Sequence, residues 1–172
     1  GGAGGPAAAG LVARSVGADG DLAGEVDWAG MGVLNARETD PNEALRSGGL
    51  VSSEEGGSPE LLFLLPFVSP VKLQSVALEA PDAAQAPKRV RLFANQRDLD
   101  MDDAAGGAAA TQEFDELKWG PPAASGAVAT TLELNFLKFQ NLGFLAVYLA
   151  RGEEEGEETP VAVQSFRVLG RV

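Results

Sequence analysis

The sequence predicts an all-β fold, a single antiparallel β-sandwich of the jelly-roll type. About eight short apolar segments follow one another along the chain, a pattern typical of sandwiches. The chain has 22 glycines and 10 prolines, which favour many turns over long helices. No segment holds a convincing helical period, and its 172 residues suit one domain of ordinary size.

The N-terminal part begins with GGAGGPAAAG, a low-complexity sequence. We interpret residues 1–20 as a flexible glycine- and alanine-rich segment and residues 21–172 as the β-sandwich domain. Within Leu22–Arg37, several glycines argue against a stable helix. Trp28 in this stretch is interpreted as an anchor in the core or in a flap over it.

The middle of the chain contains the clearest strands. Leu61–Leu65 is a run of five apolar residues that predicts a strand buried on both faces and ending at Pro66. Val71–Leu78 alternates apolar and polar residues, but the phase slips at Ser75. A slip of one residue exchanges the buried face, so a β-bulge or a strong twist is expected there.

The next strand, Val90–Ala94, alternates cleanly from Arg89 onward. Val90 and Leu92 share one face, and Arg89, Arg91 and Phe93 share the other. The plain interpretation of the two arginines is a solvated strand face. The functional interpretation is a basic recognition strip on an acidic protein.

The remaining segments continue the pattern. Asn95–Gly107 reads as a long polar loop, and Glu38–Leu45 as a loop with one helical turn after Asp40-Pro41. Phe144–Leu149 is apolar on both faces and should be a central strand. The other expected strands are Gln112–Leu117, a segment around Leu132–Phe139, and Val161–Leu169.

Composition excludes several function classes. The chain has no cysteine and no histidine, so disulfides, thiolate nucleophiles and a Ser-His-Asp triad are impossible. A zinc site would have carboxylate ligands alone, which match zinc poorly. The net charge of −12 disfavours nucleic acids and anionic membranes as partners. We therefore predict a protein that is not an enzyme and has neither cofactor nor metal.

Two clusters of carboxylates could suggest other chemistry. Asp98, Asp100 and Asp102 repeat the first spacing of an EF-hand calcium loop. The match fails at Asp103, where that loop needs glycine, and at Ala109, where it needs glutamate. The default interpretation is a solvated acidic loop, and the same holds for the acidic tip at 153–158.

A family resemblance covers most of the chain. The runs PVKLQSVALEAPD, APKRVRLFAN, DLDMDDA, LKFQNLGFLAVYLARGEEEGEE and VQSFRVLG occur in the order found in the PITH domain, and LAGEVDWAGMGVLNAR matches more loosely. The resemblance implies a jelly-roll sandwich similar to galactose-binding-like domains. It also implies association with the 26S proteasome, because a thioredoxin-like member of the family is associated with it. The thioredoxin half is missing from this sequence, so any redox role does not transfer.

These observations lead to a non-catalytic protein-interaction module that docks on the 26S proteasome, expected in the cytoplasm and nucleus. The candidate partner-binding residues are Arg89, Arg91, Asp100, Asp102, Glu154, Glu155 and Trp119. One alternative is a structural subunit of a large stable assembly, such as a cytoskeletal or ciliary complex. Another is a lectin, for which Trp119 would be the most loop-like aromatic residue, but fold analogy alone is a weak argument.

Overall fold

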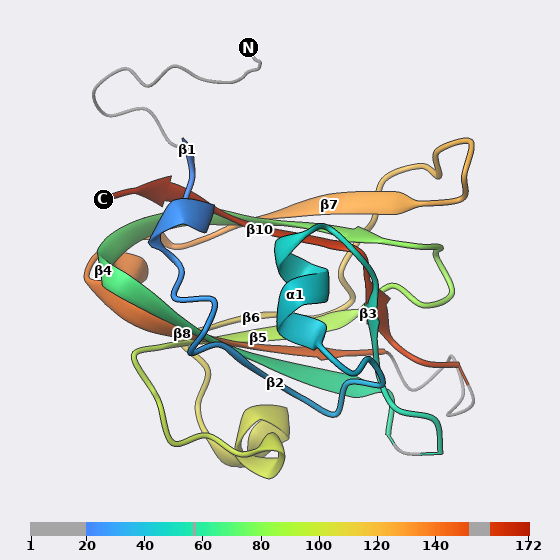
Figure 1. Cartoon of the computed structure of the whole chain (residues 1–172), viewed down its shortest axis with the longest axis horizontal. Coiled ribbons are helices and arrows are strands. Elements are labelled where there is room, and N and C mark those ends of the chain that lie inside the picture. Colours follow the sequence, from blue (N-terminus) through green and yellow to red (C-terminus); the bar gives the residue numbers. More distant parts are fainter. Residues whose placement is uncertain (1–19, 57, 152–158) are drawn as a thin grey trace.

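The computed structural model describes residues 20–56, 58–151 and 159–172. They form an antiparallel β-sandwich with short helical turns between strands (Figure 1). The strands are β1 (Gly20–Asp21), β2 (Gly32–Leu34), β3 (Val51–Ser52), β4 (Glu60–Ala80), β5 (Arg89–Ala94), β6 (Gln112–Phe114), β7 (Val128–Glu133), β8 (Leu142–Ala150), β9 (Ala162–Val163) and β10 (Ser165–Arg171). The helical elements are η2 (Ala23–Glu25), α1 (Pro41–Arg46), the π-helix η3 (Asp103–Gly107) and η4 (Phe136–Phe139).

Two layers of strands face each other across the core, and β4 belongs to both. Its first half pairs with β2 and β8, and β5 and β6 follow beyond β8. Its second half pairs with β10 on one side and β7 on the other, and β1 follows beyond β10. In Figure 1 these appear as a lower and an upper layer that meet at the bend of β4. The predicted antiparallel sandwich is therefore confirmed.

The bend of β4 corrects one expectation. The strand does not end at Pro66 but runs for 21 residues, through Pro66 and Pro70. Its pairing with β8 is interrupted between Pro66 and Val71, where the chain passes from one layer to the other. Proline, which has no N–H to donate, is tolerated where the ladder is already broken. The two apolar segments expected as separate strands are thus one continuous strand.

The bulge expected near Ser75 is present. Ser75 pairs with Leu169, but the next pair along the ladder joins Leu73 to Gly170, so Gln74 is the extra residue. At this step the backbones approach so closely that a Cβ on Gly170 would overlap the carbonyl oxygen of Lys72. The phase slip in the sequence therefore marks a true irregularity of the ladder between β4 and β10.

The main core lies between the layers, and a second apolar cluster lies outside one of them. Val90 and Leu92 point into the main core, as the alternation predicts. Phe93, Phe144 and Tyr148 point the other way and pack with Ala104 of η3. The segment expected as an open polar loop is therefore a helical cover over the outer face of the β5–β8 layer, lower left in Figure 1.

Smaller elements differ from the expectations in detail. The helical turn after Asp40 is present as α1, capped by the Asp40 carboxylate, which accepts the N–H of Glu43 at 3.2 Å. Residues Phe136–Phe139 form a 3₁₀ turn rather than a strand, and the last strand is divided into β9 and β10. Trp28 packs against the main core, as expected for an anchor. Within the described ranges, every helix is too short or too polar to cross a bilayer.

Candidate functional site

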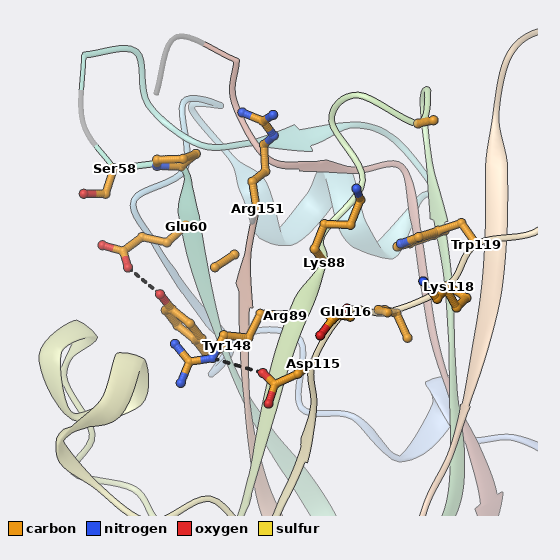
Figure 2. Close-up of a pocket in the computed structure, with 14 residues that line it drawn as sticks. Ser58, Glu60, Lys88, Arg89, Asp115, Glu116, Lys118, Trp119, Tyr148 and Arg151 are labelled. Carbon is orange, nitrogen blue, oxygen red and sulfur yellow. Dashed lines mark hydrogen bonds and ion pairs between the residues drawn. The ribbon is translucent and has the colours of Figure 1, made fainter. Parts of the chain in front are cut away.

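A groove of about 820 Å³ lies at one end of the β4–β8–β5 layer (Figure 2). Its walls come from the start of β4, the start of β5, the end of β8 and the chain that follows β6. The charged residues in these walls are Glu60, Lys88, Arg89, Asp115, Glu116, Lys118 and Arg151, and the aromatic ones are Trp119 and Tyr148.

Strand register explains why residues distant in sequence meet here. Ala150 of β8 stands opposite Glu60 on one side and opposite Arg89 on the other. Adjacent antiparallel strands are separated by about 5 Å. The ladder therefore places an acidic and a basic residue on the two flanks of one alanine, with the Tyr148 ring between them and below.

Tyr148 holds the Glu60 carboxylate in place. The Tyr148 hydroxyl donates to Oε1 of Glu60 at 2.7 Å, and the tyrosine is 4% exposed. Burial, followed by the hydrogen bond to Glu60, raises the pKa of Tyr148 far above its ordinary value. The hydroxyl therefore stays protonated at physiological pH and serves as a fixed donor to Glu60.

Arg89 faces the groove, but carboxylates already surround it. Its Nε and Nη2 donate to Oε2 of Glu113 at 3.1 and 3.0 Å, and its Nε lies 3.6 Å from Oδ1 of Asp115. The guanidinium also sits 6.0 Å from the centre of the Tyr148 ring. Because 37% of its side chain is exposed, Arg89 can still contact a partner. Glu113 and Asp115 fix the orientation of its guanidinium group beforehand.

Arg91 does not belong to an exposed recognition strip, contrary to the functional interpretation of the sequence. It is 6% exposed, and its Nη1 and Nη2 donate to the carbonyl oxygens of Ala104 and Ala108 at 2.7 and 2.9 Å. Its Nε lies 3.0 Å from Oε2 of Glu113. The interpretation as a surface residue was wrong because the π-helix covers this strand face, which the alternation in β5 does not reveal.

The acidic loop has a local structural role. Oδ1 of Asp100 accepts the N–H of Asp103 at 2.8 Å, and Oδ2 of Asp103 accepts the N–H of Asp100 at 3.3 Å. This reciprocal arrangement is that of a capping box at the start of a helical turn. Asp102 is exposed on the same turn. Neither Asp100 nor Asp102 lines the groove, and among the described residues no carboxylate cluster could hold a metal ion.

Three candidate partner-binding residues remain: Trp119, Glu154 and Glu155. Trp119 lines the groove, half-buried, and its Nε1 donates to the carbonyl oxygen of Pro87 at 2.7 Å. Glu154 and Glu155 lie outside the described residues. The structure thus brings Arg89 and Trp119 to the groove, whereas Asp100 and Asp102 do not line it, and Arg91, beside Arg89 on the same strand face, is buried.

Sequence reasoning missed the pair formed by Glu60 and Tyr148. Tyr148 stands in an apolar run, which predicts a central strand and indicates no polar contact. Two signals were available: it is the only tyrosine of the chain, and a buried tyrosine hydroxyl usually needs a partner. The identity of that partner depends on the register between β4 and β8, which the sequence does not state.

The environment of Tyr148 leads to a testable titration. The folded protein should show no tyrosinate absorbance near the ordinary pKa of 10, because burial and Glu60 both disfavour the anion. Since the folded pKa exceeds the unfolded one, this group stabilises the fold fully below pH 10, and that stability is lost as pH rises above it. Absorbance at about 295 nm, followed together with circular dichroism, measures both effects, and it reports on Tyr148 alone.

Two variants control this titration. Tyr148→Phe should abolish the signal, and Glu60→Gln should move the transition to lower pH while burial keeps it above 10. A folded protein whose tyrosine titrates at the ordinary value would contradict the hydrogen-bonded geometry.

The arrangement favours recognition of a polar surface. The groove is concave, with the half-buried Trp119 in its wall and side chains of both charge signs around it. Such a mixture suits a polypeptide with charged side chains, because complementary charges orient the partner while an aromatic residue supplies buried area.

Comparison with solved structures shows which proteins share this fold. The family 32 CBM of C. perfringens NanJ, solved with galactose, is 9% identical to this chain. The alignment covers 88% of this chain and 99% of the CBM, with a TM-score of 0.59. The two CBM32 domains of Clostridium perfringens ZmpB, solved with GalNAc, are 8% identical over 87% of this chain and 35% of that chain, with a TM-score of 0.57. The lectin domain of Lectinolysin, solved with Lewis B antigen, is 10% identical over 87% and 95%, with a TM-score of 0.51. At these identities the likeness shows the galactose-binding-like sandwich fold alone.

Comparison with protein families gives a more specific result. The model described as "PITH domain" matches residues 13–172. The match includes every strand and helical element of the fold and every wall of the groove.

Proposed function

Because the chain belongs to the PITH domain family, we propose that it is a non-catalytic protein-interaction module that associates with the 26S proteasome. The observation that carries the proposal is the family match over residues 13–172. We further propose that the groove between β4, β5 and β8 is the contact surface, and that the protein acts in the cytoplasm and nucleus.

Charge and shape support the groove as the contact surface. Lys118 is exposed in its wall beside the half-buried Trp119, and Glu60 and Arg89 are held by their own partners. Preorganised charges lose little conformational freedom when a partner binds. The walls hold four basic side chains against three acidic ones, so an acidic region of a partner meets less repulsion here than the net charge of −12 would suggest.

Co-sedimentation with purified 26S proteasome tests both parts of the proposal. The chain should sediment with the particles at low salt and dissociate as salt rises, because exposed charges are screened. Lys118→Glu should weaken the binding by about tenfold, in the range of a single interface charge reversal.

The matched control is Lys72→Glu, which reverses an exposed lysine outside the groove and should bind like the natural chain. Equal binding by both variants would reject the groove while leaving the association intact. A chain that stays in the supernatant at every salt concentration would reject the association itself.

A further inference from the structure

A second surface lies on the other layer, where the edge of β10 is only partly covered. β1 pairs with β10 through Gly20–Gly170 and Asp21–Leu169. The last bond of this ladder joins the Leu22 N–H to the Val168 carbonyl oxygen at 2.8 Å. The chain then turns into η2, and in the described ranges no strand continues along β10 on that side.

The uncovered part of the edge has backbone groups directed outward. In an antiparallel strand, residues two positions apart direct their N–H and C=O groups to the same side. Val168 faces β1, so Phe166 directs its backbone groups to the same side, beyond the point where β1 has ended. An edge of this kind can accept one more short strand.

Beside this edge lies a slot of about 250 Å³. Its apolar walls include Trp28, Leu45 of α1, and Phe166. Pockets for whole small molecules begin at about 300 Å³, so the slot is sized for one large apolar side chain. In Figure 1, α1 lies in front of the space between the two layers.

Two arginines line the slot without ion-pair partners. Arg46 is the last residue of α1, Arg167 lies on β10, and both are exposed. In the part of the chain that the structure describes, neither arginine has a carboxylate within ion-pair distance. Asp21 also lines the slot, but its Oδ1 accepts the N–H of Ala23 at 2.8 Å. In a chain with 25 acidic residues, two unpaired guanidinium groups beside an apolar slot are complementary to carboxylates from another molecule.

We propose that this edge and slot bind an extended acidic segment of a protein partner. The segment adds a short strand to β10, inserts one large apolar side chain against Trp28 and Phe166, and places flanking carboxylates on Arg46 and Arg167. The slot shares no residue with the groove, so this proposal holds independently of the association with the proteasome.

Synthetic peptides test the recognition directly. The probe is fluorescein-labelled Glu-Asp-Glu-Leu-Glu-Asp-Glu, and fluorescence anisotropy against the full chain measures its affinity. Replacing the central leucine by serine should weaken binding at least tenfold, because the slot then loses its apolar occupant. Replacing all acidic residues by lysine should abolish binding.

Two protein variants and two modified peptides make the test specific. The double variant Arg46→Glu, Arg167→Glu should weaken binding at least tenfold, whereas Arg37→Glu, at an exposed arginine paired with Glu55, should leave it unchanged. If the double reversal impairs folding, Arg46→Gln, Arg167→Gln replaces it. Peptides N-methylated at the odd or at the even amides should differ in affinity, because only one set faces β10.

Three results would overturn the proposal. They are equal affinity for the leucine and serine peptides, affinity that is indifferent to both arginine variants, and equal losses for the two methylated peptides. Absence of binding at millimolar peptide would also overturn it.

Discussion

Replacing Arg91 by methionine should lower the free energy of unfolding by about 3 kcal/mol and release the helical cover around η3. The variant removes both donors to the carbonyl oxygens of Ala104 and Ala108 and the ion pair to Glu113. Those carbonyl groups then lack partners, while Glu113, with 34% of its side chain exposed, can be rehydrated. Methionine keeps the apolar part of the side chain, so the loss reports on the guanidinium.

Two measurements follow this change. The melting temperature should fall by about 6–12 °C, since each kcal/mol corresponds to about 2–4 °C in a domain of this size. Hydrogen exchange should accelerate most in residues 99–110, because Arg91 donates to two carbonyl groups of this cover. Unchanged exchange there would show that the apolar contacts of the cover suffice without Arg91.

Arg89→Met is the matched control, two residues away on the same strand face. Arg89 is partly exposed and its carboxylate partners are accessible to water, so the expected loss is below about 1 kcal/mol. A larger loss for Arg89→Met than for Arg91→Met would reverse the assignment of their roles.

Among the glycines that the structure describes, Gly170 should tolerate alanine least, and Gly170→Ala should lower the free energy of unfolding by at least about 3 kcal/mol. The new methyl group would overlap the Lys72 carbonyl oxygen, and its next neighbours are the Lys72 carbonyl carbon and Leu73 Cα, at 3.0 and 3.1 Å. All three are backbone atoms of the central strand, so no side chain can rotate away. Relief would require β10 to separate from β4 at the bulge.

Urea denaturation measures this loss, and Gly24→Ala provides the control. A Cβ at Gly24 meets no atom within 4 Å, so its unfolding free energy should change by less than about 0.5 kcal/mol. Comparable midpoints for the two variants would mean that the ladder between β4 and β10 is looser than the structure shows.

The sequence predicted the fold well because the relevant information is local. The alternation in Arg89–Phe93, the apolar run at Phe144 and the phase slip at Ser75 each describe the environment of one strand, and each is confirmed in the structure. Pro66 misled the prediction because a proline marks an interrupted ladder, and an interruption ends a strand in some folds and bends it in others.

The candidate site was predicted less well because it depends on contacts between distant segments. Arg89 and Arg91 have the same local signature, and only the cover around Ala104 makes one accessible and the other buried. Likewise, Glu60 and Tyr148 are separated by 88 positions, and nothing near either residue names the other. Strand register and the packing of the cover decide these roles.

The continuity of β4 has a consequence for how the molecule assembles. Since 21 consecutive residues supply a strand to each layer, β4 is what joins β2 to β8 in one layer and β7 to β10 in the other. Opening the backbone near Val68, as in a circular permutant, would divide the one segment common to both halves. We therefore expect the two layers to unfold in one transition.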